Sequence, residues 1–326
     1  MLEKILGALL PAVITILLGY FAARHHDFEQ KEVPTLNRMV MGYALPLSLF
    51  VGVVSAGRAE LLADMPLAII LAIAIIGMYW AIFLLARFGL RYSAGLSALA
   101  ALTASAPSTA FVGSAVLGYL YGAKADIPVA IGSIIIVLAL VPVTLIVLSL
   151  ETNARPAHRR GQPAAASGPQ AQPQDPDIVG KILGALKQPL VWLPLLGFVM
   201  VLVDVEVPQV AENSLLLLGH ASAGVALFSS GIILAGYKVV VNGPVLFLVF
   251  VKNILQPALV LGGMLWFGYT NPILGEAVLT SALPVVVLAV MLSVQYHVAA
   301  RETASALLLS TVGSLITMSA FIWFLL

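Results

Sequence analysis

Two six-residue stretches decide the fold of this chain: Leu102-Thr103-Ala104-Ser105-Ala106-Pro107 and Leu279-Thr280-Ser281-Ala282-Leu283-Pro284. They stand 177 residues apart, and each puts a proline inside a long apolar segment. Proline has no backbone N–H and clashes with the carbonyl four residues earlier, so it breaks or kinks a helix. The pair therefore predicts two broken helices at equivalent positions of an internal repeat.

Further matches extend this repeat in both directions. The stretch Lys4–Leu9 recurs as Lys181–Leu186, and Tyr119 matches Tyr296, again at an offset of 177. One match could arise by chance in so apolar a chain, but several in the same order at one offset indicate duplication. The sequence therefore predicts two copies of one structural unit.

The composition places this repeat in a membrane. The chain of 326 residues is 61% hydrophobic and 10% charged, whereas a soluble domain is roughly 45–50% apolar and about 25% charged. This excludes an ordinary soluble enzyme, and the net charge of +1 offers no basic surface for a nucleic acid. The lack of cysteine excludes disulfides, thiol catalysis and zinc–thiolate sites.

A transmembrane helix needs about 20 mostly apolar residues. Ten segments meet that requirement, at residues 5–23, 34–56, 66–88, 94–121, 127–150, 180–203, 212–237, 243–267, 273–297 and 302–325. The predicted fold class is thus an all-α polytopic membrane protein with ten transmembrane helices. Each half holds five spans, an odd number, so the second half enters the membrane from the opposite side. Such inverted repeats are typical of secondary transporters.

A hydrophilic linker separates the halves and helps to set their orientation. Residues 151–178 are rich in proline, alanine and glutamine and divide the first unit, residues 1–150, from the second, residues 179–326. With the N-terminus outside, 12 of the 16 basic residues fall on the inner side and 3 on the outer. The positive-inside rule then predicts a multi-pass protein of the cell membrane with both termini outside and the linker in the cytoplasm.

The two prolines also predict where a ligand binds. A broken helix exposes the positive N-terminus of its second half at mid-membrane, where free N–H groups can hold an anion. We expect these donors at Ser108, Thr109, Ala110, Val285, Val286 and Val287. The alternative is that both prolines only kink packing helices. The candidate substrate-binding residues are Ser105, Pro107, Ser108, Thr109, Pro284, Val285, Val286 and His220.

Two ionisable residues within the spans are further candidates. His220 carries an imidazole that can bind a substrate or relay a proton near neutral pH, or can simply pack as a satisfied histidine. Lys252 is the only basic residue deep in a span, which is costly unless it is paired or hydrated. We expect it to balance the charge of an anion or to replace a coupling cation. The alternative is that it binds backbone carbonyls or snorkels to the membrane surface.

Several of these stretches resemble the auxin efflux carrier family, which includes the plant PIN carriers and bacterial malate or malonate permeases. The resemblance covers nearly the whole chain. It rests on Ser105-Ala106-Pro107-Ser108-Thr109 with Gly113, on Asn37-Arg38 with Leu45-Pro46-Leu47-Ser48, on Ala221 to Gly231, on Lys252 with Pro257, and on Ala282-Leu283-Pro284 with Tyr296.

The resemblance implies a particular architecture and substrate. Spans 1, 2, 6 and 7 would form a scaffold that makes a homodimer, and spans 3–5 and 8–10 a mobile transport domain around crossed helices 4 and 9, as in bile-acid symporters. Transport would be elevator-like, with organic carboxylates as substrates. The auxin carriers usually have asparagine at Ser108, and a polar residue and glycine at Val285-Val286. These departures favour a small or partly apolar carboxylate over auxin.

The leading hypothesis is a secondary transporter of small organic carboxylates, driven by gradients because no nucleotide-binding motif is present. The alternatives are a sodium- or proton-coupled symporter of another organic anion and a membrane sensor or binding protein. An intramembrane enzyme would need paired aspartates, a serine–histidine pair or a metal triad, so no enzyme activity, metal or cofactor is expected. The expected partners are the organic anion, the lipid bilayer and a second copy of the chain, and no nucleic acid.

Overall fold

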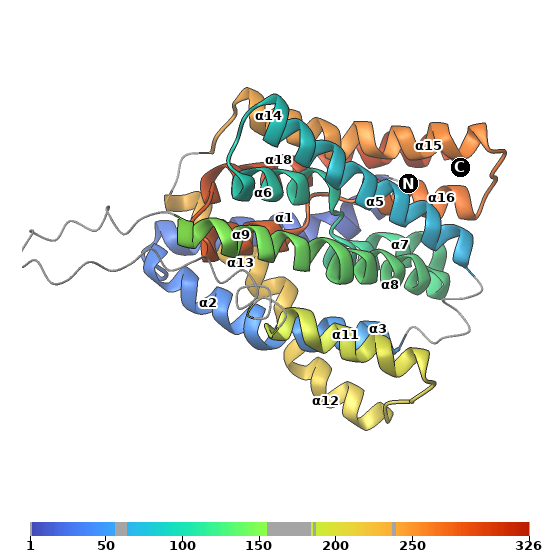
Figure 1. The fold of residues 1–326 in the computed structure, drawn as a ribbon, viewed down its shortest axis with the longest axis horizontal. Coiled ribbons are helices and arrows are strands. Elements are labelled where there is room, and N and C mark those ends of the chain that lie inside the picture. Colours follow the sequence, from blue (N-terminus) through green and yellow to red (C-terminus); the bar gives the residue numbers. More distant parts are fainter. Residues whose placement is uncertain (1, 56–63, 155–183, 185–186, 237–238, 326) are drawn as a thin grey trace, which may run out of the picture.

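The computed structural model shows a chain built from helices (Figure 1). It describes residues 2–55, 64–154, 184, 187–236 and 239–325. Within these ranges the only strand-like pairing is an isolated bridge between Pro107 and Val285. From residue 155 onward the expected linker lies outside the described residues, and its first positions extend helix α9 (Val141–Ala154).

The described residues form a polytopic membrane protein, as the composition predicts. Six helical segments are long and apolar enough to cross a membrane: Gln30–Val54, Met65–Gly89, Ile127–Glu151, Gln209–Gly236, Gly243–Trp266 and Ala300–Leu325. Four apolar helices are shorter: Leu10–Arg24, Ala94–Ser105, Pro189–Leu202 and Ile273–Ala282. Each expected span overlaps one of these segments, and the crossing of all ten stays a prediction.

The helices are arranged in layers (Figure 1). One side of the view holds α2 (Val33–Met39), α3 (Leu45–Val54), α11 (Pro189–Leu202) and α12 (Gln209–Gly219). The opposite side holds α5 (Met65–Leu84), α14 (Gly243–Phe250), α15 (Gln256–Trp266) and α18 (Ala300–Leu325). Helices α8 (Asp126–Ile135) and α9 lie between them in this view.

Two glycines bring the backbones of α1 (Leu2–Arg24) and α13 (Ala221–Gly236) into contact. A Cβ on Gly19 would lie 2.0 Å from the carbonyl oxygen of Phe228, and one on Gly231 would lie 2.0 Å from that of Ile16. No side chain fits at either position. Small residues allow this close approach, which is a common way to pack helices in lipid, where the hydrophobic effect gives no drive for association.

Three helices widen into a π-helical turn just before a proline. The turns η2 (Val40–Ala44), η6 (Ile136–Leu140) and η7 (Val251–Leu255) each end two residues before Pro46, Pro142 or Pro257. Each proline removes the hydrogen bond to the carbonyl four residues earlier, which lies inside the widened turn. Such turns frequently mark functional sites, and residues of η6 and η7 belong to the site described next.

Candidate functional site

Both helices that carry the repeated prolines are interrupted at them. Helix α6 (Ala94–Ser105) ends before Pro107, and the chain becomes helical again at η4 (Thr109–Gly113) and α7 (Ser114–Tyr121). Helix α16 (Ile273–Ala282) ends before Pro284, and α17 (Val287–Gln295) follows. The extended residues between these helices form the break in each span.

The two breaks are hydrogen-bonded to each other. The Ser108 N–H donates to the Pro284 carbonyl at 2.9 Å, and the Val286 N–H donates to the Ala106 carbonyl at 3.1 Å. This pair makes the bridge between Pro107 and Val285. We name the structure formed by residues 106–108 and 284–286 the crossover.

This pairing uses donors that the sequence led us to expect free. Besides Ser108 and Val286, the Thr109 N–H donates to the Pro107 carbonyl at 2.9 Å. The Val285 N–H donates to the Ser310 hydroxyl at 3.0 Å. The reason is that buried backbone groups must find partners, and each break is the nearest partner of the other. Four of the six expected N–H donors therefore form hydrogen bonds within the chain. The polar groups that face the cavity are side-chain hydroxyls.

The polar side chains at the crossover are hydroxyls. Thr109 Oγ1 and Ser133 Oγ of α8 are hydrogen-bonded at 2.9 Å. Ser108 is 1% exposed, and its Oγ has no hydrogen-bond partner in the described part of the chain. A buried unpaired polar group costs about 1–3 kcal/mol, so the Ser108 hydroxyl is placed to receive a ligand or a water molecule.

These hydroxyls face a small cavity between α3 and the crossover. Its lining combines Leu45 and Leu49 of α3 with Ser108, Thr109, Ala110, Ser133, Ile136, Val137, Val286 and Leu288. Its volume is about 20 Å³, room for roughly one water molecule. In this structure the cavity is therefore too small to hold an organic anion.

Ser133 and Ser310 were missed from the sequence. They are 177 residues apart, the same offset as the two prolines. Ser133 binds Thr109 beside one break, and Ser310 binds Val285 beside the other. Ser310 is held in turn by Asn253, whose Oδ1 accepts from Ser310 Oγ at 2.6 Å. The repeat offset applied to every serine was the signal that could have found them.

A second polar pair binds the C-terminal ends of the half-helices. Lys252 Nζ donates to the Ser281 carbonyl of α16 at 2.6 Å and to Gln256 Oε1 at 2.8 Å. Gln256 Nε2 donates to the Ser105 carbonyl of α6 at 2.9 Å. The C-terminus of a helix carries partial negative charge. A protonated Lys252 therefore stabilises the C-terminus of α16 directly and that of α6 through Gln256. Lys252 is fully buried and does not line the crossover cavity.

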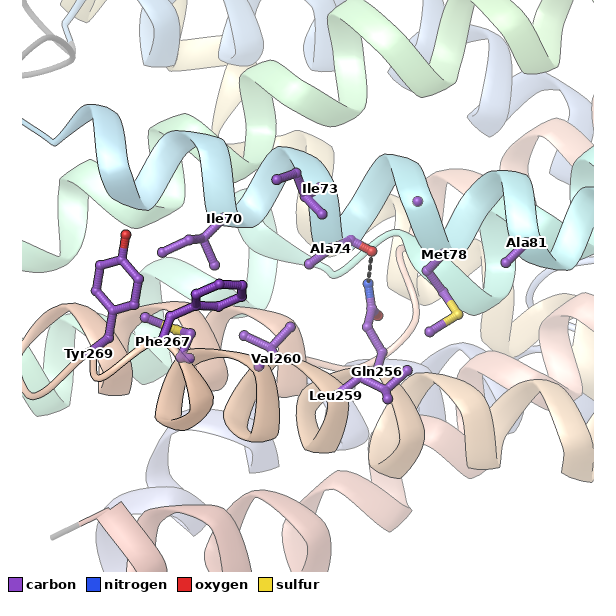
Figure 2. A pocket seen from close by; sticks show the side chains of 13 residues that line it. Ile70, Ile73, Ala74, Met78, Ala81, Gln256, Leu259, Val260, Phe267 and Tyr269 are labelled. Carbon is purple, nitrogen blue, oxygen red and sulfur yellow. Dashed lines mark hydrogen bonds between the residues drawn. The ribbon is translucent and has the colours of Figure 1, made fainter.

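Gln256 also forms the floor of an apolar groove between α5 and α15. Figure 2 shows its side chain reaching across to Ala74, whose carbonyl accepts from Nε2 at 3.4 Å. The groove has a volume of about 370 Å³ and an otherwise mainly hydrophobic lining that includes Ile73, Val260 and Phe267. Both hydrogens of the Gln256 amide are already used, so this groove offers little to an anion.

The candidate residues thus fall into three places. Pro107, Ser108, Thr109, Pro284, Val285 and Val286 meet at the crossover. Ser105 ends α6 beside it, where its hydroxyl donates to the Ala101 carbonyl at 2.7 Å, and Lys252 joins it through Gln256. His220 is exposed at the joint between α12 and α13 and does not line the cavity, so its role in binding stays a prediction.

The chain is similar to known membrane transport proteins over nearly its whole length. A family model described as membrane transport protein matches residues 4–322. The chain is 31% identical over 327 residues to a protein named uncharacterized transporter YfdV from Escherichia coli (strain K12). The alignment covers 99% of this chain and 98% of that relative. Proteins of the same name from Escherichia coli O157:H7 and Shigella flexneri match equally.

Proposed function

Since this chain belongs to the auxin efflux carrier family of membrane transport proteins, we propose that it is a secondary transporter of small organic carboxylates, with the anion held at the crossover. The observation that carries the proposal is the buried, unpaired Ser108 hydroxyl at the cavity between α3 and the two breaks. A hydroxyl can donate to a carboxylate, and the hydrogen-bonded pair of Thr109 and Ser133 leaves one further hydroxyl hydrogen beside it. The apolar remainder of the cavity favours a small or partly apolar anion.

We further propose that transport is of the elevator type. The boundary at the cavity is apolar on both sides, with Leu45 and Leu49 of α3 facing Ile136, Val137 and Leu288. Apolar surfaces make no directional bonds that must break when one slides over the other. The crossover can then move as one body past α3, which exposes the site to one side of the membrane at a time.

Lys252 enters this proposal as a built-in cation. It lies where a coupling ion would balance the negative ends of α6 and α16, held by the Ser281 carbonyl and by Gln256. We therefore expect uptake without a sodium gradient. A symporter that needs sodium is the second candidate, and the same assay separates the two.

The test is uptake of radiolabelled acetate, malonate and malate by proteoliposomes that contain the purified protein. The expected result is saturable uptake of at least one anion, compared with protein-free liposomes, in sodium-free buffer. Uptake that appears only with a sodium gradient would favour the symporter. Absence of uptake for all three by correctly folded protein would overturn carboxylate transport and leave the membrane sensor as the alternative.

A further inference from the structure

A third and larger cavity lies between the second span, the start of α11 and the end of α17. Its volume is about 580 Å³, within the range of roughly 300–1,000 Å³ typical of small-molecule sites. Its polar lining residues are Asn37, Arg38, Gln188, Gln295 and His297. We name this cavity the vestibule. Arg38, Gln295 and His297 are exposed, so solutes reach it from solution.

The chemistry of the vestibule suits an anion. All five polar residues can donate hydrogen bonds, and among the described residues that line the cavity none is acidic. In the described part of the chain, Arg38 makes neither a salt bridge nor a side-chain hydrogen bond. Its guanidinium can therefore bind a carboxylate through two parallel hydrogen bonds.

Asn37 adds a second, independent hydrogen-bond donor to the vestibule. Its side chain is 4% exposed, and its Oδ1 accepts from Ser229 Oγ at 3.3 Å. Its Nδ2, in contrast, is buried and has no partner among the residues that the structure describes. An amide with one satisfied end and one unpaired donor at a polar cavity is positioned for an acceptor that arrives from outside the chain.

The vestibule and the crossover cavity share two walls. Met41 lines the vestibule, and Leu45, four residues further along the same span, lines the crossover cavity. These positions are about one helical turn apart, within and just after the π-helical turn η2. On the other wall, Val294 of α17 lines the vestibule and Leu288 of the same helix lines the crossover cavity. The two cavities are therefore neighbours along both walls.

We propose that the vestibule is a carboxylate-binding site that captures the substrate at Arg38 and Asn37 before it reaches Ser108. This rests on the proposed function, because it assigns the first station on the route to the crossover. The two walls of the vestibule belong to different helices, since Asn37 lies in α2 and Val294 lies in α17. Separation of α3 from the crossover would join the two cavities and let the captured anion move inward.

The test compares Arg38→Gln with Arg24→Gln in uptake and in binding. Both arginines are exposed. They lie at the same end of the helices, because only a short segment joins the end of α1 to the start of α2. Arg24 donates to Tyr20 OH at 3.1 Å and does not line the vestibule, so it controls for the loss of charge. We expect Arg38→Gln to raise the KM for malonate roughly 10- to 100-fold, the effect of losing a hydrogen bond to a charged group, with kcat unchanged. The KM of Arg38→Lys should lie between that of the wild type and that of Arg38→Gln.

The outcomes separate this inference from the proposed function. An equal KM in Arg38→Gln and Arg24→Gln, with normal wild-type uptake, would overturn the vestibule and leave carboxylate transport standing. If the wild type takes up no carboxylate, binding of radiolabelled malonate to the detergent-purified proteins decides. Binding lost only in Arg38→Gln supports the vestibule even then, and binding that is absent or equal in both variants overturns it.

Discussion

Ser108→Ala is the substitution that distinguishes a binding site from a packing position. At an ordinary buried serine, loss of the hydroxyl breaks a hydrogen bond and lowers stability. Ser108 Oγ has no partner, so the alanine variant removes an unpaired group whose burial costs about 1–3 kcal/mol. We expect the thermal midpoint of the detergent-purified protein to stay equal or rise. Alanine is smaller than serine, so this substitution cannot overpack the cavity of about 20 Å³.

The affinity should move in the opposite direction. A hydrogen bond to a charged group contributes about 1.5–3 kcal/mol, and each 1.4 kcal/mol is a factor of ten. The KM for carboxylate uptake should therefore rise roughly 10- to 100-fold in Ser108→Ala. Ser97→Ala is the matched control, since Ser97 is buried in the same helical span and its hydroxyl donates to the Ser93 carbonyl at 2.8 Å. An unchanged KM, or a loss of stability as large as that of the control, would refute the assignment of Ser108 to the substrate.

Three further predictions concern the surroundings of the site. Lys252→Met leaves two buried acceptors without their donor, so uptake should fall or change its pH dependence. The measurement is uptake from pH 5 to pH 8. A pH profile like that of the wild type would argue against a charge-balancing role. Gly231→Ala should destabilise the protein by about 1–3 kcal/mol through overpacking, whereas Gly224→Ala in the same helix, where a Cβ meets nothing within 4 Å, should not; equal thermal midpoints would contradict the close contact with α1. Ser310→Ala leaves the Val285 N–H unpaired and should lower the midpoint more than Ser319→Ala on the same helix, a difference that thermal unfolding in detergent can measure.

The sequence predicted the helical class and the position of the breaks because both depend on local chemistry. Apolar length marks the spans, and proline at 107 and 284 cannot continue a helix in either copy. The family followed from short motifs around these prolines and in the second, seventh and eighth spans, and it is confirmed by the match over residues 4–322.

The polar content of the site could not be predicted in the same way. Whether the Ser108 N–H is free depends on the Pro284 carbonyl, 176 residues away in the chain, and no local pattern encodes that contact. The vestibule joins residues of the second span to Gln188 and to the end of α17, which are adjacent only after folding. In each case the sequence lacked the tertiary contacts that decide which distant residues become neighbours.

The bridge between the breaks has a consequence for how the chain is made. It joins residues from the two halves, so when only the first half has been synthesised the Ser108 N–H and the Ala106 carbonyl have no partner. In lipid each unpaired backbone group costs several kcal/mol. The first half therefore completes this pairing only after the second half has been made. The order of biosynthesis leaves the backbone of the first break unpaired until its counterpart arrives.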